Sequence, residues 1–171
     1  HGTPYYSAFE ACVQSVMASF NSWNGVKMHG HEYLLTDVLR DQMGFNGLVV
    51  GDWNGHGEVP GCTNANCPES FNAGVDIYMA PDEWKELYTN TVRAVKSGDI
   101  SENRLDDAVR KILTVKQRLG MLDGRKPHEY ENYIGKIEHR ELAREAVSKS
   151  LVLLKNNNNL LPLDSTKHFL V

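Results

Sequence analysis

One aspartate stands at a position where α/β proteins commonly do chemistry. Asp52 comes two residues after the apolar run Leu48-Val49-Val50, and Trp53 follows it. In parallel βα folds, functional side chains gather at the carboxyl ends of strands, where the loops form one face. A carboxylate held there has the fixed position that a nucleophile or a general base needs, and Trp53 offers a flat apolar face that can stack on a sugar ring. The spacing leaves a plainer alternative open, in which Asp52 caps the segment that follows.

Two other segments occupy predicted strand ends of the same kind. One contains Phe20 and Trp23, which are equally compatible with a core role and with anchoring a loop. The other is the short turn Met79-Ala80-Pro81. We expect all three segments to meet at one edge of the sheet.

Three histidines raise the question of a metal. His29 and His31 form an H-x-H pair, and His56 follows Asp52 in the chain. No acidic or cysteine partner completes a zinc ligand set with clear spacing. Loop histidines engaged in hydrogen bonds are therefore the favoured interpretation, and no metal site is predicted.

The three cysteines divide into a pair and a single residue. Cys62 and Cys67 are separated by four residues and could close a small disulfide ring or remain free thiols. We favour the disulfide, which would indicate an oxidising compartment. Cys12 lies among apolar residues and is expected to be a small buried hydrophobe.

Short apolar runs alternate with helical patterns through the first hundred residues. Such runs suit strands buried on both faces of a parallel sheet, and helices between them indicate repeated βα units. The predicted strands lie within residues 13–20, 48–50 and 75–79. Helices are predicted around residues 34–39, over 82–97, over 101–119 and over 139–155. The apolar face of the 82–97 helix carries Trp84, Leu87, Tyr88, Val92 and Val95. The inward face of the 139–155 helix carries Leu142, Ala146, Val147, Ser150, Leu151 and Leu154. Residues 122–138 show no period and are interpreted as a linker.

Composition excludes several classes of protein. A chain of 171 residues with 41% hydrophobic and 23% charged residues resembles ordinary globular proteins rather than disordered ones. No apolar run is long enough for a transmembrane helix. The 18 Lys and Arg against 22 Asp and Glu give a net charge of -4, without the clustered basic excess of nucleic-acid binders. The sequence does not begin with Met and stops as an apolar run starts, so we expect a piece cut from a longer protein.

Several motifs, in order along the chain, resemble the β-glucosidases and glucan exohydrolases of glycoside hydrolase family 3. The matching segments are Val16–Gly25, Leu34–Arg40, Gly44–Trp53, Arg144–Asn156 and Asn159–Leu163. The family usually has Ser-Asp-Trp where this chain has Gly51-Asp52-Trp53. The resemblance implies an α/β fold in which a (β/α)8-type barrel is followed by an α/β sandwich domain. Residues 1–121 would be the C-terminal part of the barrel, residues 122–138 a linker, and residues 139–171 the start of the sandwich domain.

The resemblance also implies an activity, which is retaining exo-hydrolysis of β-glucosides or β-glucans through a glycosyl-Asp52 intermediate. Trp53 would help bind the leaving-group sugar, and Met17 and Phe20 would lie near the glucosyl pocket, although Phe20 lacks the hydroxyl that some relatives carry. The acid/base residue is expected outside this chain, since Glu58 matches nothing in the family motif. A β-N-acetylhexosaminidase of the same family and a non-catalytic carbohydrate-binding relative are the alternatives.

The predicted chemistry also sets the expected partners. It needs no metal or organic cofactor, and its partner would be a small-molecule or oligosaccharide β-glucoside. We expect neither nucleic acid nor a membrane among the partners, and a periplasmic or secreted location follows from the family and the predicted disulfide. The sequence gives no oligomeric state.

Overall fold

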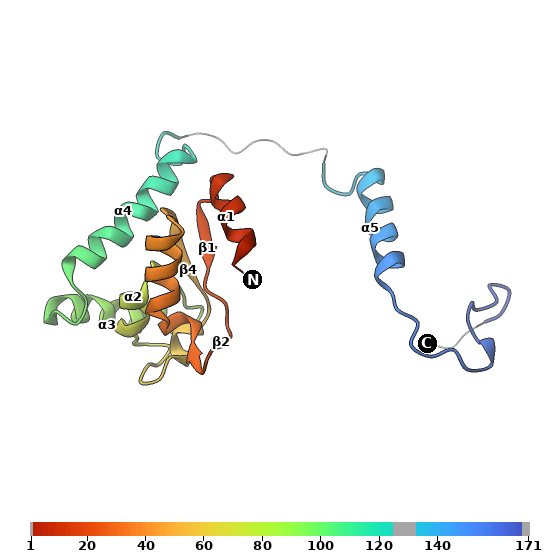
Figure 1. Cartoon of the computed structure of the whole chain (residues 1–171), viewed down its shortest axis with the longest axis horizontal. Coiled ribbons are helices and arrows are strands. Elements are labelled where there is room, and N and C mark those ends of the chain that lie inside the picture. Colours follow the sequence, from red (N-terminus) through yellow and green to blue (C-terminus); the bar gives the residue numbers. More distant parts are fainter. Residues whose placement is uncertain (1, 125–132, 169–171) are drawn as a thin grey trace. The chain divides into compact units, whose positions relative to one another are not determined.

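The chain divides into two compact units. A computed structural model describes residues 2–124 and 133–168, and the two units are His1–Arg125 and Lys126–Val171. Figure 1 traces both units along the chain. The division between the two units falls within residues 122–138, the segment interpreted as a linker. Within that segment, residues 125–132 lie outside the described residues.

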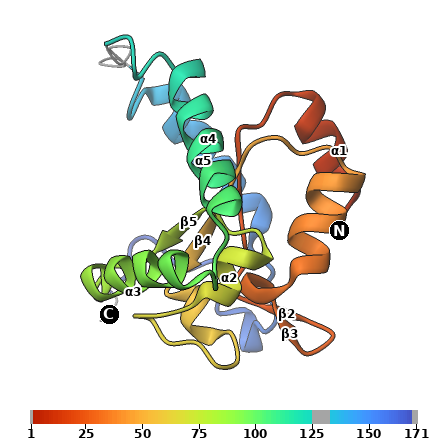
Figure 2. The same ribbon diagram turned by 90° about the vertical axis from the view of Figure 1, so that its left-hand side faces the viewer.

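The larger unit is built on a three-stranded parallel sheet with the strand order β1-β4-β5. The strands are β1 (Ser15–Met17), β4 (Leu48–Trp53) and β5 (Ile77–Met79). Each connection between them passes through a helix, so the sheet consists of βα units, and the predicted parallel α/β class is confirmed (Figure 2). The β1 and β5 segments are shorter than the apolar runs that predicted them.

One face of the sheet is covered by η2 (Tyr33–Gln42), a helix with π-type hydrogen bonding. Val49 of β4 is fully buried and belongs to one apolar cluster with Leu35 and Leu39 of η2. Burial of such side chains contributes about 1.5–3 kcal/mol each. Gly44 follows the helix with a φ of +72°, a conformation that glycine adopts without strain, and the helix ends there as predicted.

Other helices of this unit flank the sheet, and the last three of them carry a second apolar cluster. They are α1 (Thr3–Glu10), α2 (Pro68–Ala73), α3 (Trp84–Ser97) and α4 (Glu102–Arg118). The Ser101 hydroxyl accepts the Arg104 N–H at 3.2 Å, so α4 begins at the predicted cap. Ala108 of α4 is buried with Phe71 of α2 and Ala94 of α3. Helix α1 was not predicted.

The prediction that Trp84 and Tyr88 face the core was wrong. Both side chains are exposed, and Leu87 and Ala94 are the buried residues of α3. Residues 84 and 88 share one side of a helix, but Leu87 lies toward the core and sets which side is buried. The apolar stripe of α3 is therefore narrower than its sequence indicates.

A buried ionic cluster joins the sheet to two helices. The Asp76 carboxylate is fully buried and binds Arg40 of η2 at 2.6 Å and Arg104 of α4 at 2.9 Å. It also accepts the Val49 N–H at 2.8 Å. A buried carboxylate is tolerated only when it is paired and hydrogen-bonded, and Asp76 meets both conditions. The cluster therefore fixes how η2 and α4 pack on the sheet.

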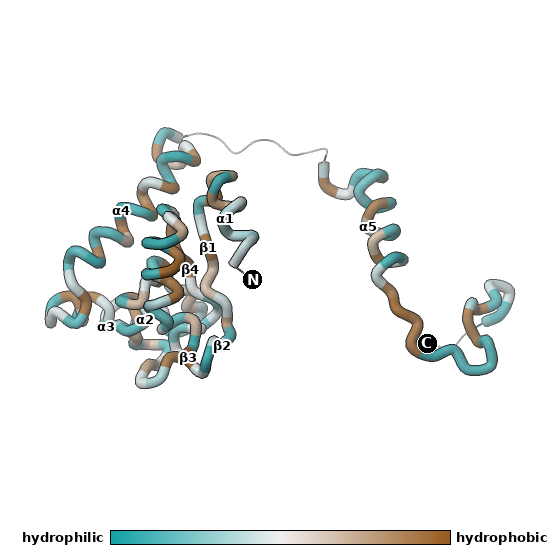
Figure 3. Tube along the Cα trace, in the orientation of Figure 1, coloured by the Kyte–Doolittle hydropathy of each residue, from teal (hydrophilic) through white to brown (hydrophobic). Residues whose placement is uncertain are grey.

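The smaller unit consists of α5 (Ile137–Ser150), an extended segment and the short helix η4 (Asn157–Asn159). The prediction of one helix over 139–155 was wrong at its C-terminal end, because residues 151–155 are not helical. Leu151-Val152-Leu153-Leu154 is a continuous apolar run without helical period, which is more typical of a strand (Figure 3). The predicted inward side chains Leu142, Val147, Leu151 and Leu154 are all exposed within this unit.

Among the helices of the described residues, none combines the length and the apolar character that a bilayer span requires.

Candidate active site

Asp52 lies where the ends of the three parallel strands meet. In the sheet, Val50 pairs with Met17 of β1 and with Ile77 of β5. The register with β5 shifts beyond Val50, but Gly51 still faces the His29 ring. Asp52, the next residue, therefore points to the opposite face of the sheet, which it shares with Val50. The Asn54 N–H donates to the Met79 carbonyl at 2.9 Å, which closes the strand end against β5.

The Asp52 carboxylate is held in one orientation and remains partly accessible. Its Oδ1 accepts the Trp53 N–H at 2.7 Å, and the residue is of intermediate burial. Among the hydrogen bonds of the described residues, Oδ2 takes part in none, so one carboxylate oxygen is oriented and the other is available. An oriented carboxylate with one free oxygen suits a nucleophile.

His29 holds the backbone of Asp52 by accepting its N–H. It lies in η1 (Met28–Gly30), is only 2% exposed, and its Nε2 lies 2.7 Å from the Asp52 nitrogen. A backbone N–H can only donate, so Nε2 must be the unprotonated acceptor and Nδ1 carries the ring proton. Burial lowers the pKa of His29, while the nearby Asp52 charge opposes this shift and His56 and Lys27 add to it. The sequence drew attention to His29 as part of an H-x-H pair, but it did not predict the contact between His29 and the Asp52 N–H.

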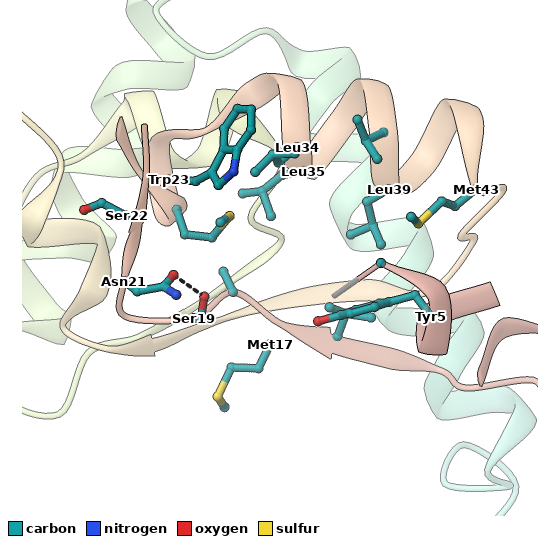
Figure 4. A pocket seen from close by; sticks show the side chains of 15 residues that line it. Tyr5, Met17, Ser19, Asn21, Ser22, Trp23, Leu34, Leu35, Leu39 and Met43 are labelled. Carbon is teal, nitrogen blue, oxygen red and sulfur yellow. Dashed lines mark hydrogen bonds between the residues drawn. The ribbon is translucent and has the colours of Figure 1, made fainter. Parts of the chain in front are cut away.

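The three residues predicted to bind the sugar all present accessible side chains. Trp53 is 61% exposed, Met17 49% and Phe20 48%. In Figure 4, Met17 projects from the side of β1 opposite to Leu34 and its neighbours on η2. Lys27 lies over the Phe20 ring, with Nζ 5.7 Å from the ring centroid. Because Met17 pairs with Val50 and projects away from η2, it lies on the Asp52 face of the sheet.

A hollow elsewhere in this unit is mainly apolar. It has a volume of about 490 Å³ between α1, β1 and η2, and its lining includes Tyr5, Leu35 and Met43 (Figure 4). Asp52 does not line it, whereas Trp23 and Met17 do. Its lining offers no carboxylate for bond cleavage, and we place the chemistry at the strand end.

Glu58 is the carboxylate closest to Asp52 in the chain on its C-terminal side. It lies in η3 (Gly55–Glu58), is half exposed, and forms an ion pair with Lys27 at 3.3 Å. Lys27 belongs to β3 (Val26–Lys27), which pairs with β2 (Ser22–Trp23) in a hairpin after β1. The ion pair therefore links two loops of the Asp52 edge, and Glu58 has a structural partner there.

The histidines make hydrogen bonds, which agrees with the favoured interpretation of the sequence. The His31 Nδ1 accepts the Leu34 N–H at 3.4 Å, and the His56 Nε2 lies 2.8 Å from the Asn64 carbonyl oxygen. Within residues 2–124 and 133–168, the grouping of potential metal ligands is Cys62, Cys67 and Glu69.

Cys62 and Cys67 are joined by a disulfide, so their sulfurs are not available as thiolate ligands. Cys67 is buried, and its carbonyl accepts the Tyr78 hydroxyl hydrogen at 2.5 Å. Burial raises the pKa of that hydroxyl. The disulfide loop is thus anchored to β5. The expectation that Cys12 is buried was wrong, because Cys12 is exposed after the last turn of α1.

The parallel βα unit agrees with comparisons to known proteins. The sequence model of the glycosyl hydrolase family 3 N-terminal domain matches residues 1–115, which is well over half of the chain. This chain belongs to glycosyl hydrolase family 3. The N-terminal domain of that family has a TIM-barrel-type fold. The boundary between barrel and sandwich stays a prediction.

The family-3 relatives are much longer than this chain. A β-xylosidase of Formosa agariphila is 38% identical over 95% of the chain, which covers 25% of that protein. A periplasmic β-glucosidase of Salmonella typhimurium is 36% identical over 94% of the chain and 22% of its own length. The solved exo-1,3/1,4-β-glucanase of a Pseudoalteromonas species is 51% identical, with a TM-score of 0.80 over 95% of the chain and 21% of that structure. The chain thus spans about a quarter of the length of the curated relatives it matches.

Proposed function

We propose that this family-3 chain carries the nucleophile of a retaining exo-β-glucosidase, and that Asp52 is that nucleophile. The observation that carries the proposal is the Asp52 carboxylate at the end of β4, with Oδ1 bound to the Trp53 amide and Oδ2 free. In such a mechanism Oδ2 bonds to the anomeric carbon as the glycosidic C–O bond breaks. A second carboxyl group gives its proton to the leaving oxygen, and water later releases the sugar from Asp52.

The division of labour that we propose is compatible with the length of the relatives. The chain would supply the C-terminal part of the barrel through residue 121, a linker over 122–138 and the start of the sandwich domain over 139–171. The acid/base residue would come from another part of a longer protein. Trp53, Met17 and Phe20, all accessible around this strand end, would contact the sugar.

The substrate class we propose is a β-glucoside or β-glucan, released from the chain end. Support comes from the names of the relatives, one a β-glucosidase and one an exo-1,3/1,4-β-glucanase. None of these relatives is named a hexosaminidase, so they give that alternative no support. The disulfide Cys62–Cys67 and the periplasmic relative support a periplasmic or secreted location.

The test uses the full-length protein that contains this chain and an aryl β-glucoside. Asp52→Asn keeps the shape of the side chain but removes the charge, and we expect kcat to fall by about 10⁴-fold. A 2-deoxy-2-fluoro glucoside should label the wild-type protein on the peptide that contains Asp52. Glu58→Gln is the matched control and should retain activity. Labelling of a different carboxylate, or full activity of Asp52→Asn, would refute the assignment.

A further inference from the structure

We propose that His29 is a positioning residue for the nucleophile, because its Nε2 accepts the Asp52 N–H and fixes the strand end that carries the attacking carboxylate. The inference rests on the proposed function of Asp52 and adds a second residue to it. His29 itself need not touch the sugar.

The backbone of β4 needs this contact because the strand pairing is interrupted at Asp52. Pairing with β1 ends at Val50, and pairing with β5 shifts register between Val50 and Trp53. The Asp52 N–H therefore meets the His29 ring at 2.7 Å in place of a strand carbonyl. An amide left without an acceptor would lose free energy comparable to a hydrogen bond, and the strand end would be free to shift.

The imidazole is enclosed so that it keeps this place. A Cβ at Gly55 would lie 2.3 Å from His29 Cε1, so the ring occupies the space that any side chain at position 55 would need. On the other side, a Cβ at Gly51 would lie 3.4 Å from His29 Cδ2, which is ordinary contact. The Met28 N–H donates to the Asn21 carbonyl at 3.0 Å and ties η1 to the loop after β1. The ring is thus held from several sides while Nε2 remains on the Asp52 amide.

Burial keeps the accepting nitrogen of His29 free of a proton. Burial is the main cause that lowers its pKa. The charged and titratable groups that act on it are Asp52 from β4, which favours the imidazolium, and His56 from η3 and Lys27 from β3, which disfavour it. At neutral pH the imidazole is therefore neutral and accepts the amide hydrogen.

The experiment separates the acceptor from the bulk of the ring. In the full-length protein, His29→Gln places an amide oxygen at about the reach of Nε2, whereas His29→Phe and His29→Met fill the space without an equivalent acceptor. His31→Gln is the matched control, a buried histidine nearby whose Nδ1 accepts the Leu34 N–H instead. Each protein is trapped with a 2-deoxy-2-fluoro glucoside bearing an activated leaving group, which reports attack by Asp52 without help from the acid/base residue. Thermal unfolding identifies variants that fail to fold. If one of His29→Phe and His29→Met does not fold, the other still tests the loss of the acceptor.

We expect the limiting trapping rate of His29→Phe and His29→Met to fall by about tenfold, with the half-saturating concentration unchanged. His29→Gln should stay within about threefold of the wild type, since it restores the acceptor. The proposal is overturned if His29→Gln is as slow as His29→Phe, if all variants trap at the wild-type rate, or if His31→Gln slows as much as His29→Phe. A wild-type protein that is not labelled at Asp52 overturns the proposed function and this inference together, which distinguishes it from the other outcomes.

Discussion

At the scale of single residues, the contact between Gly55 and His29 makes a sharp stability prediction. Gly55→Ala would place a Cβ 2.3 Å from Cε1 and 2.5 Å from Nε2 of His29, so the ring must move off the Asp52 amide. We expect the free energy of unfolding to fall by about 1–3 kcal/mol, because overpacking a filled site has that cost. Urea unfolding of the 171-residue chain measures it.

Gly51→Ala is the control, since its Cβ would meet the same ring at 3.4 Å and Ile77 O at 3.5 Å. Its backbone φ lies outside the left-handed region, so alanine is not strained there. We expect a change within about 0.5 kcal/mol, the usual range for substitutions that disturb no special contact. Equal stability of Gly55→Ala and Gly51→Ala would contradict the packing described for His29.

The lowered pKa of His29 predicts a pH dependence of stability with a defined sign. The unfolded chain takes up a proton near the ordinary histidine pKa of about 6.5, while folded His29 does so only at lower pH. Between these values the unfolded state binds more protons, so stability falls as the pH drops below about 6.5, by at most about 1.4 kcal/mol per pH unit for this group. His29→Gln should remove that contribution and flatten the curve of unfolding free energy between pH 7.5 and pH 5. Parallel curves for the two proteins would show that His29 titrates alike in both states.

The residues of the site differ in how far sequence reasoning reaches them. Asp52 could be chosen as a candidate because strand, glycine and aspartate are consecutive and because carboxyl ends of parallel strands collect functional groups. His29 could not, since its contact with Asp52 joins residues 23 positions apart through an interruption of strand pairing. Sequence periodicity does not indicate where the pairing of two strands shifts register. The sequence near His29 therefore cannot show that its side chain takes the place of a strand carbonyl as the acceptor for Asp52.

At the scale of elements, the ionic cluster around Asp76 predicts a large and specific loss of stability. Asp76→Asn keeps the volume but leaves Arg40 and Arg104 without their common anion in a buried setting. Breaking a buried ion pair by removing one partner costs about 3–5 kcal/mol, and we expect that loss in urea unfolding.

The matched control for Asp76 is Asp107→Asn. Asp107 pairs with Lys111 on α4 and, at 3.6 Å, with Arg104, but its side chain is 42% exposed and therefore screened by solvent. Exposed pairs contribute about 0–1 kcal/mol, so this variant should unfold close to the wild type. A similar loss in both variants would mean that the Asp76 cluster does not hold η2 and α4 to the sheet.

Helix ends were predictable from local chemistry, and helix faces were predictable only in part. Ser101 and Gly44 mark helix ends because a hydroxyl cap and a left-handed glycine act within a few residues. By contrast, Trp84 and Tyr88 sit beside the buried Leu87 on α3 and are nevertheless exposed. Which part of an apolar stripe is covered depends on the neighbouring elements, which the periodicity of one segment does not describe.

At the scale of the whole molecule, the open inner face of the sheet bears on what the chain does by itself. Met17 is half exposed, and Val50 and Ile77 on the same face are only partly buried. In a closed (β/α)8 barrel, side chains on the inner face are packed in layers. The strands described here therefore present Asp52 on a face that further strands of such a barrel would enclose. The proposed mechanism also needs a second carboxyl group besides Asp52.

We accordingly predict that the purified 171-residue chain hydrolyses no aryl β-glucoside at a measurable rate. Water reaches the Asp52 face, so a sugar would lack both the enclosure that orients it and the acid that protonates its leaving oxygen. Release of the aryl group is followed by absorbance, with the Asp52→Asn chain assayed at the same concentration to detect a contaminating glycosidase. Turnover present in both proteins would be contamination, whereas turnover that Asp52→Asn abolishes would show that three strands and one carboxylate suffice.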